Sequence, residues 1–288
     1  MTLVSIITPS FNQGQFIERT IQSVLNQSTP NIDIEYFIFD GGSTDNTLEV
    51  LNSYSEQVKW ESQKDGGQAE AVNKGFKVAK GDIVGWLNSD DIYYPGAVKS
   101  VVEFFEKNPE VDLVYGLADH IDEGDRVFEA YPVEEWDYDR LKFTCIICQP
   151  ALFFRRRVFE RYGLLNDKLK FCMDYEYWLR LGEAGAKFSL LNAKLAGSRF
   201  YPNTKTSGSS ILVHGEINDM FLSNFGSVPD RWLYNYAHAV VDPLRQNKIR
   251  TRMFEIRVAM VTAFAALKWN HKITSEMTAT LKQWLFGS

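Results

Sequence analysis

Short apolar runs alternate with segments of helical periodicity over residues 1–107. Residues 3–8, 34–39, 58–61 and 83–87 are rich in β-branched and aromatic side chains, which predicts four strands. Between and after them, apolar side chains recur at helical spacing, and these are Ile17, Ile21, Val24 and Leu25, then Leu48 and Leu51, then Ala69, Val72, Phe76 and Ala79, then Val98, Val101, Val102 and Phe105. Strands that alternate with helices predict an open, mostly parallel α/β sheet.

The remainder of the chain is less regular and then becomes helical. Residues 113–115, 151–154 and 187–191 are expected to form strands, and residues 175–181 a helix. After about residue 208 the pattern is helical throughout. One apolar stripe at three- and four-residue steps consists of Met253, Ile256, Met260, Phe264 and Leu267.

Polar segments directly follow three of the predicted strands. They are Pro9-Ser10-Phe11-Asn12, Asp40-Gly41-Gly42 and Asn88-Ser89-Asp90-Asp91. In open α/β sheets, ligands bind in a crevice outside the carboxyl ends of the strands, so we expect the three segments to face one site. The adjacent carboxylates of Asp90 and Asp91 suit either a solvated turn or a hard divalent cation that bridges them to phosphate. Their position at the end of a buried strand favours the cation.

Composition and charge narrow the class of protein. Apolar residues make up 45% of the chain and aromatic residues 14%, which predicts a packed core and not a disordered chain. The net charge of -6 is uneven, because the segment from Arg231 onward carries a net charge of +6 and the rest carries -12. We expect an α/β domain over residues 1–215 and a basic helical extension over residues 216–288. Nucleic acid is excluded as the main ligand of so acidic a body.

Several other classes are disfavoured by what the sequence lacks. No G-x-G-x-x-G follows the first strand and no G-x-x-x-x-G-K-[ST] occurs, which argues against a nicotinamide enzyme and a P-loop kinase. The cysteines, Cys145, Cys148 and Cys172, are interpreted as buried thiols, because a zinc site needs four ligands. Neither a signal peptide nor an apolar window of about 18 residues is found, so we expect a cytoplasmic protein.

Five motifs, in this order, resemble those of the family 2 glycosyltransferases. The motifs are SIITPSFN at residues 5–12, FDGGSTDNT at 39–47, KDGGQAEAVNKG at 64–75, WLNSDD at 86–91 and CMDYEYWLRL at 172–181. The resemblance covers roughly residues 3–206 and implies the GT-A fold, with a nucleotide-sugar half at about 1–110 and an acceptor half at about 111–215. It also implies the inverting transfer of a sugar from a nucleotide-sugar, with UDP as the expected nucleotide, to an acceptor hydroxyl.

The resemblance further implies roles for individual residues. Asp90 matches the metal-binding Asp of the family's D-x-D motif, with Asn88 in place of the first Asp and Ser89 between them. The implied metal is Mn²⁺ or Mg²⁺. Contacts to the nucleotide are implied for Pro9, Phe11, Asp40, Asp65 and Asn73, besides Asn88 and Ser89. Asp174 is the candidate general base, and Glu176 is the alternative.

A second set of residues is expected at the edges of this site. The set consists of Asp91, Gln149, Glu176, Trp178, Arg199, Tyr201 and Lys205. Asp91 is expected to support Asp90, and Gln149 to border the acceptor. Trp178 is interpreted as a packing residue or as a surface beneath the acceptor. The basic side chains and Tyr201 are candidates for contacts to phosphate, and residues 203–210 are expected to form a lid.

Three functions remain open at the level of the sequence. The first is an enzyme that builds a surface polysaccharide or glycan on a saccharide or lipid-linked saccharide acceptor. The second is a binding module that has lost catalysis, because Asn88, Met173 and Tyr201 depart from the family pattern. A nucleotidyltransferase ranks last, since residues 9–14 contain no basic side chain. The basic extension is expected to pack on the α/β domain or on a second subunit, or to lie on an anionic membrane.

Overall fold

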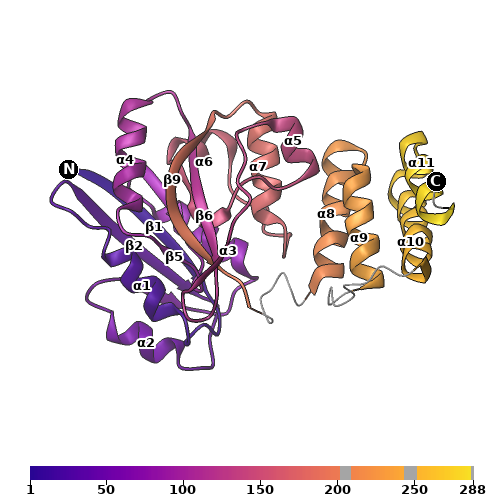
Figure 1. The fold of residues 1–288 in the computed structure, drawn as a ribbon. Helices are drawn as coiled ribbons and strands as arrows, with labels where there is room; N and C mark the ends of the chain where they lie inside the picture. The colour runs from indigo at the N-terminus through magenta and orange to yellow at the C-terminus, as the bar shows by residue number, and fades with distance from the viewer. Residues whose placement is uncertain (202–208, 243–251, 287–288) are drawn as a thin grey trace. The chain divides into compact units, whose positions relative to one another are not determined.

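The apolar runs of the first third of the chain form neighbouring parallel strands in the computed structural model, which describes residues 1–201, 209–242 and 252–286. These strands are β1 (Thr2–Ser10), β2 (Ile32–Asp40), β3 (Lys59–Ser62) and β4 (Ile83–Trp86). β1 lies beside β2 (Figure 1), with β4 on the other side of β1 and β3 beyond β2. All four predicted strands are confirmed, with ends that differ from the prediction by at most two residues.

The same sheet continues through strands from the middle of the chain. They are β5 (Ile92–Tyr93), β6 (Leu113–Ile121), β7 (Val127–Ala130), β8 (Leu152–Arg155) and β9 (Phe188–Arg199). The strand order is β3-β2-β1-β4-β8-β6-β9-β5, with β7 paired to β6. Because β8 runs antiparallel to both β4 and β6, the sheet is mixed, and the expected parallel arrangement describes its amino-terminal part. β5 and β7 are absent from the sequence prediction, because β5 has only two residues and β7 is exposed along its whole length.

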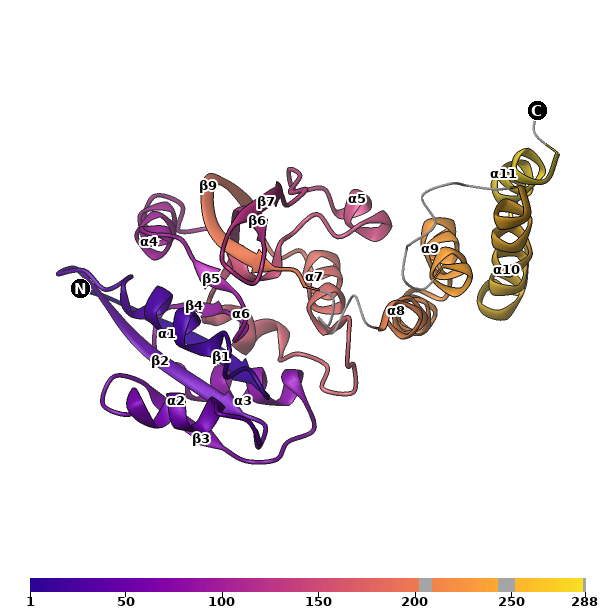
Figure 2. The same cartoon turned by 60° about the horizontal axis from the view of Figure 1, so that its bottom comes forward.

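Helices flank this sheet (Figure 2). They are α1 (Ile17–Leu25), α2 (Thr47–Ser53), α3 (Gln68–Val78), α4 (Ala97–Lys107), α5 (Tyr138–Phe143), α6 (Arg157–Tyr162) and α7 (Met173–Glu183), with a short 3-10 helix at Gln149–Ala151. The helices predicted from apolar spacing are confirmed as α1 to α4 and α7. α3 packs closely on β1, because a Cβ at Gly75 would lie 2.3 Å from Ile7 Cγ2.

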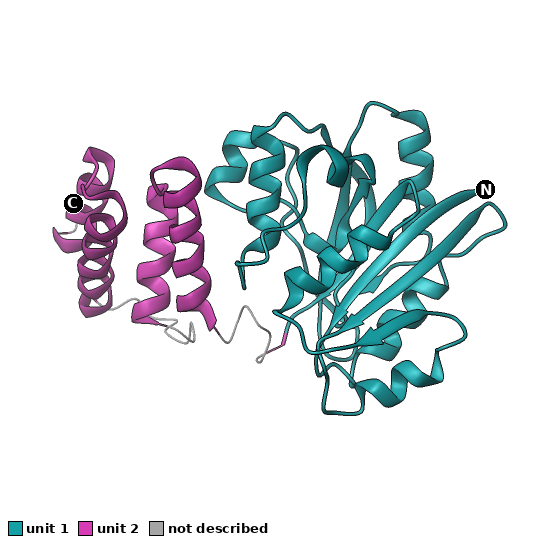
Figure 3. Cartoon of the chain, turned by 180° about the vertical axis from the view of Figure 1, so that it is seen from behind, with its two compact units in different colours: residues 1–200 teal, residues 201–288 magenta. Residues whose placement is uncertain are grey.

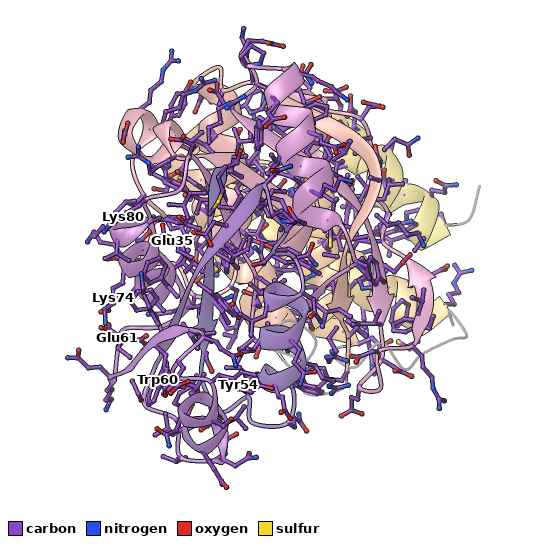
Figure 4. All side chains as sticks on the ribbon, turned by 90° about the vertical axis from the view of Figure 1, so that its left-hand side faces the viewer. Glu35, Tyr54, Trp60, Glu61, Lys74 and Lys80 are labelled. Atoms are coloured by element: carbon purple, nitrogen blue, oxygen red, sulfur yellow. The ribbon has the colours of Figure 1, made fainter. Side chains whose placement is uncertain are left out.

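Glu35 on β2 fixes the point at which β4 enters the sheet. Its Oε1 accepts hydrogen bonds from Ser5 Oγ on β1 and from the backbone N–H groups of Lys80 and Gly81, just before β4 (Figure 4). Backbone donors are costly to leave unpaired away from water, so this carboxylate holds the residues that lead into β4. It thereby sets the register in which β1, β2 and β4 end at the opposite edge.

The described chain divides into two compact units, residues 1–200 and residues 201–288 (Figure 3). The core of the first unit lies between the sheet and its helices and includes Val4, Ile6, Val98, Phe105 and Phe153. All three cysteines are free thiols, and Cys148 and Cys172 are buried while Cys145 is partly exposed.

The second unit is helical, as the pattern after residue 208 predicts. Its helices are α8 (Ser210–Phe225), α9 (Asp230–Val241), α10 (Arg252–Asn270) and α11 (Ser275–Phe286). Trp269 of α10 donates a hydrogen bond to Asp219 of α8 (2.7 Å), and Asn270 bonds both backbone groups of Val228. None of the helices in the described ranges is long and apolar enough to cross a membrane.

The apolar stripe of α10 lies on the surface of the second unit. Met253, Met260, Phe264 and Leu267 are each 53–66% exposed. The buried face of the helix instead carries mostly small residues, and these are Val258, Ala259, Thr262, Ala265 and Ala266, together with Trp269. Apolar spacing alone therefore does not identify the face of α10 that packs in the core.

Candidate functional site

The polar segments after β1, β2 and β4 lie at one edge of the sheet. Ser10 pairs with Asp40 and Asp40 pairs with Ser62, so β1, β2 and β3 end at the same level. Leu87, the first residue after β4, donates its N–H to the Ile7 carbonyl of β1 (3.0 Å). This register places the three strand ends at one edge of the sheet, as the prediction of a common site requires.

Phe11 and Asp65 meet at the end of β1 and β2. A Cβ at Gly41 would lie 3.5 Å from Phe11 Cδ2 and 3.3 Å from Asp65 Oδ1, so the missing side chain allows ring and carboxylate to adjoin. The Phe11 ring is 59% exposed, which is unusual for so large an apolar side chain and leaves a face available for stacking. Desolvation raises the pKa of Asp65, and the negative charge of Glu70 adds to this rise. Pro9 precedes them as a buried residue of β1.

Asp40 closes the loop that follows β2. Its Oδ2 accepts from the N–H groups of Gly42 (3.0 Å) and Ser43 (2.8 Å) and from Ser62 Oγ (2.6 Å), while Oδ1 accepts from Ser43 Oγ. An ionised carboxylate can accept about four hydrogen bonds, so these bonds occupy all the acceptor positions of Asp40. The buried Asp40 therefore shapes the loop that presents Gly41 to Phe11 and Asp65.

Asn73 is buried in α3 and holds a distant loop. Its Nδ2 donates to the Leu165 carbonyl (2.9 Å) and its Oδ1 accepts from the Leu165 N–H (3.0 Å). Both ends of the amide are thus engaged with one residue. Asn73 positions residues near 165 against α3, and any contribution to nucleotide binding acts through that loop.

Asn88 is the centre of a hydrogen-bonded network at the end of β4. Its Oδ1 accepts from Gln68 Nε2 (2.8 Å) and Trp86 Nε1 (2.9 Å), and its Nδ2 donates to Gln149 Oε1 (2.8 Å) and Asp91 Oδ2 (3.2 Å). Gln149 in turn donates to the Trp86 carbonyl (2.7 Å). An amide both donates and accepts, which explains why Asn and not Asp suits this position. Gln68 was not foreseen from the sequence, because its partner lies 20 residues away.

Asp91 and Arg199 support the loop that contains Asp90. The buried Asp91 accepts from the Arg199 N–H (2.8 Å), and Arg199 Nε donates to the Asp90 carbonyl (2.7 Å). The Arg199 guanidinium also pairs with Asp125 and lies 4.7 Å from the centre of the Phe16 ring. Burial raises the pKa of Asp91 well above its usual value, and the negative charge of Asp90 adds to this rise. In the structure, Arg199 therefore supports the Asp90 loop instead of making the phosphate contact that the sequence led us to expect.

A side chain of α1 forms hydrogen bonds with the main chain of this loop. Thr20 Oγ1 donates to the carbonyl oxygens of Ser89 (3.0 Å) and Asp91 (2.8 Å). Ser89 is itself buried, whereas Asp90 is half-buried. The loop therefore has a defined shape in which Asp90 occupies its outer position.

The residues at this loop fit a divalent cation that is shared with a diphosphate. Over residues 1–201, 209–242 and 252–286, no group of three or more His, Cys, Asp or Glu is arranged to hold a metal. Mg²⁺ commonly uses only one or two carboxylates together with substrate phosphates, and an all-protein cage is not required. Asp90 is the carboxylate of this loop that matches the expected metal ligand. The side chains of Asn88 and Asp91 form hydrogen bonds with protein groups.

Asp174 lies in the first turn of α7, where its Oδ1 accepts from the Tyr175 N–H (2.7 Å). A helix N-terminus favours negative charge at this position. Desolvation raises the pKa of Cys145 to about 12, and the charge of Asp174 adds to this rise. The pKa of Cys148 is also raised, first by burial, next by the charge of Asp91 and to a lesser degree by that of Asp174. Asp174 and Asp91 are therefore both close to the segment of Cys145 and Cys148.

Glu176 and Trp178 are part of the support of α7. Glu176 is buried and forms an ion pair with Arg180 (2.9 Å), which also donates to the carbonyl groups of Tyr162 and Leu164. Trp178 is fully buried, and its ring centre lies 5.6 Å from that of Phe154. The interpretation of Trp178 as a packing residue agrees with this environment. Of the two candidate bases on α7, Asp174 is more accessible than Glu176.

The remaining candidates lie near or beyond the end of β9. Tyr201 is half-buried and is the first residue of the second unit. Lys205 and most of the expected lid lie outside the described residues. A basic residue that the sequence did not single out is Lys170, whose Nζ donates to the Gly66 carbonyl beside Asp65. The sequence alone gives no sign of this contact, because 104 residues separate Lys170 from Gly66.

Sequence comparisons find relatives over most of the chain. A family model described as "Glycosyl transferase family 2" matches residues 5–172. A chondroitin synthase of Pasteurella multocida is 32% identical over 77% of this chain and 24% of its own length. A hyaluronan synthase of Pasteurella multocida is 34% identical over 71% of this chain and 21% of its own length. The chain thus spans about a quarter or less of the length of these relatives.

Solved structures with a similar fold include two that hold nucleotide-sugars. S. aureus TarS in complex with UDP-GlcNAc has a TM-score of 0.64 at 17% identity, covering 99% of this chain and 87% of that chain. The mannosyltransferase PcManGT from Pyrobaculum calidifontis in complex with GDP-Man and Mn²⁺ has a TM-score of 0.60 at 17% identity, covering 97% and 78%. At these identities the likeness shows a shared fold.

Proposed function

Since the chain belongs to glycosyl transferase family 2 and has the GT-A fold, we propose that it transfers a sugar from a UDP-sugar to an acceptor hydroxyl with inversion at the transferred carbon. The single observation that carries this proposal is the common edge of the sheet at which Phe11, Asp65, the Asn88–Asp90 loop and β9 come together. We further propose that the acceptor is a saccharide or a lipid-linked saccharide, as expected for the assembly of a polysaccharide.

The proposed nucleotide site consists of Phe11 and Asp65. The exposed Phe11 ring offers a face on which a base can stack, and the Asp65 carboxylate adjoins it as a hydrogen-bond acceptor. Uracil carries an N–H that such a carboxylate can accept. Asp40 keeps the loop in place through Gly42 and Ser43.

Asp90 is proposed to hold Mn²⁺ or Mg²⁺ together with the diphosphate. When bound, such a cation offsets the negative charge that develops on the leaving diphosphate. The network of Asn88, Gln149 and Arg199 keeps the Asp90 loop in one shape before the donor arrives. A preorganised loop spends no binding energy on its own ordering.

Asp174 is proposed to act as the general base. Inversion requires the acceptor oxygen to attack from the face opposite the leaving diphosphate, and a carboxylate there accepts the proton of the attacking hydroxyl. Asp174 stands on α7, an element separate from the Asp90 loop, and its Oδ1 is oriented by the Tyr175 N–H. Once the proton is on Asp174, the acceptor oxygen is the nucleophile that forms the new glycosidic bond.

We also propose that the second unit contacts an anionic membrane through α10. Its exposed apolar residues, among them Met260 and Phe264, lie on one helix face, and the exposed Arg257 and Lys268 lie beside them. An exposed helix face that carries apolar side chains with basic side chains beside them suits the interface of an anionic membrane. This contact would bring the enzyme to a lipid-linked acceptor.

Calorimetric titration with UDP, GDP and dTDP, each with and without Mn²⁺, tests the donor site directly. We expect UDP to bind in the presence of Mn²⁺ and Asp90→Ala to weaken this binding roughly tenfold or more, since even indirect loss of a metal ligand's support costs about that much. Asp82→Ala is the matched control. Asp82 lies just before the first residue of β4, whereas Asp90 follows the last one, and the Asp82 side chain is 87% exposed.

Two results would contradict the proposal in different ways. Equal binding of UDP by Asp90→Ala, with and without Mn²⁺, would remove Asp90 from the metal site. Absence of binding by all three nucleotides in the unaltered protein would instead favour a module that has lost catalysis.

A further inference from the structure

Four aromatic side chains from three segments of the first unit meet at the carboxyl end of β6. The ring of His120 on β6 lies 6.0 Å from Phe128 on β7, 5.1 Å from Tyr131 and 5.9 Å from Phe200. We refer to His120, Phe128, Tyr131 and Phe200 as the His120 cluster. The rings of His120 and Phe128 are nearly parallel, with an interplanar angle of 13°.

The His120 cluster is open to solvent on one side. Phe128 is 54% exposed and Phe200 is 50% exposed, while Tyr131 is partly buried beneath them. Aromatic side chains normally gain their stabilisation by burial, so two half-exposed Phe rings in one cluster contribute little to the core. Exposed apolar side chains that lie next to one another are candidates for a binding surface.

The strand order places the His120 cluster on the acceptor side of the reaction centre. Along the sheet, β2 and β1 carry Asp40 and Phe11, β4 carries the Asp90 loop, and β8 separates β4 from β6. Because β8 is antiparallel to both neighbours, β6 ends at the same edge as β4, and β9 runs parallel to β6. In the strand order, the cluster therefore lies at the same edge as the Asp90 loop, on the side of β4 away from β1 and β2.

Two contacts connect the cluster to the proposed catalytic groups. Arg199, the residue before Phe200, donates to the Asp90 carbonyl (2.7 Å). Tyr131 lies close enough to Asp174 for the charge of that carboxylate to raise its pKa, after the larger effects of burial, Cys145 and Cys148. Phe200 thus follows directly after a residue that supports the Asp90 loop, and Tyr131 Oη lies 3.4 Å from the carbonyl oxygen of Ile147, in the segment between Cys145 and Cys148.

We propose that the His120 cluster binds a sugar ring of the acceptor saccharide, an inference that rests on the transferase function proposed above. The C–H groups on one face of a pyranose form an apolar surface, which packs on the electron-rich face of an aromatic ring. A transferase must hold its acceptor on the side of Asp90 away from the nucleotide, and the cluster occupies that side. A saccharide chain laid on Phe128 and Phe200 would extend from the candidate base along the end of β6.

Binding of defined oligosaccharides tests this proposal without requiring transfer. Chondroitin, hyaluronan and maltose hexasaccharides are titrated into the protein of residues 1–288 in the presence of UDP and Mn²⁺, and binding is followed by NMR of the saccharide. We expect at least one hexasaccharide to bind, and Phe128→Ala and Phe200→Ala each to weaken it about threefold to tenfold. Both replaced rings are half-exposed, so both variants should remain folded.

Val127→Ala is the matched control, because Val127 precedes Phe128 on β7, is 52% exposed and points to the other face of the strand. Its saccharide affinity should equal that of the unaltered protein. The proposal is wrong if no hexasaccharide binds, or if the two Phe variants bind as tightly as the Val127 control. Titration of the same samples with UDP separates the proposed acceptor site from the proposed transferase function. A protein that binds saccharide but not UDP would count only against the transferase function.

Discussion

At the scale of single residues, the polar side chains around the candidate site differ in what they contact. Asp40, Asn88 and Asp91 make several hydrogen bonds to neighbouring loops and fix the shape of the strand ends. Asp90 and Asp174 occupy the outer position of a loop and the first turn of a helix. The proposed chemistry is assigned to Asp90 because it lies in the loop after β4, at the edge shared with β1 and β2, and to Asp174 because it lies in the first turn of α7 and is more exposed than Glu176.

Replacement of Asp174 by Asn tests the general base. Asn cannot accept the proton of the acceptor hydroxyl, so kcat for transfer should fall by roughly 10²- to 10⁴-fold, while Mn²⁺-dependent binding of UDP is retained. The measurements are steady-state transfer from the UDP-sugar and calorimetric binding of UDP. Asp139→Asn on the exposed surface of α5 is the control and should change neither. Turnover of Asp174→Asn at the rate of that control would exclude Asp174 as the base.

At the scale of elements, the site depends on the register of strands whose ends form it. β4 is joined to β1 and β2 at its beginning by Glu35, and the Asp90 loop at its end is joined to β9 by Arg199 and Asp91. Neither contact is local in sequence. The position of Asp90 relative to Phe11 therefore follows from the pairing of whole strands.

Replacement of Glu35 by Ala tests how much this pairing depends on one side chain. The Lys80 N–H and the Ser5 hydroxyl lose their acceptor, and the Gly81 N–H keeps only Ser5 Oγ, which should lower the free energy of unfolding by roughly 1–3 kcal/mol in a urea titration. Asp33→Ala is the control, because Asp33 is an exposed acid on the same strand, and its effect should stay within about 0.5 kcal/mol. Equal stability of the two variants would show that Glu35 does not hold the turn before β4.

At the scale of the whole molecule, charge and exposed apolar surface are unevenly shared. The chain up to residue 230 carries a net charge of -12, and the part from Arg231 onward carries +6. The second unit also exposes the apolar stripe of α10. In the proposed membrane contact, this positive charge would attract the second unit to an anionic surface, and the stripe would add a hydrophobic contribution.

Binding to lipid vesicles tests the proposed membrane contact. We expect the protein to sediment with phosphatidylglycerol vesicles but not with phosphatidylcholine vesicles, and to be released as salt is raised. The double variant Met260→Ser/Phe264→Ser should bind roughly tenfold or more weakly, because each buried apolar side chain contributes about 1.5–3 kcal/mol. Leu212→Ser on α8 removes a side chain of similar exposure (62%) and is the control. Identical binding of the double variant and this control would contradict a role for α10.

The sequence by itself determined the parts of this protein that depend on local patterns. The strands and helices of residues 1–107 follow from apolar spacing, because burial of one face imposes a period of two or 3.6 residues. The segments of Phe11, Asp40 and Asp90 share one edge because parallel strands in such sheets end together. Five ordered motifs indicated the family, which the comparisons bear out.

Only the tertiary structure decided which side chains act on one another. The bonds of Asn88 to Gln149 and of Arg199 to the Asp90 loop join residues 61 and 109 positions apart, and no local period encodes such partners. The insertion of β8 between β4 and β6 brings the His120 cluster to the edge that carries Asp90. Small residues and not the apolar stripe form the buried face of α10, because the shape of neighbouring helices decides which face fits. Local periodicity fixes the elements, and long-range packing selects their contacts.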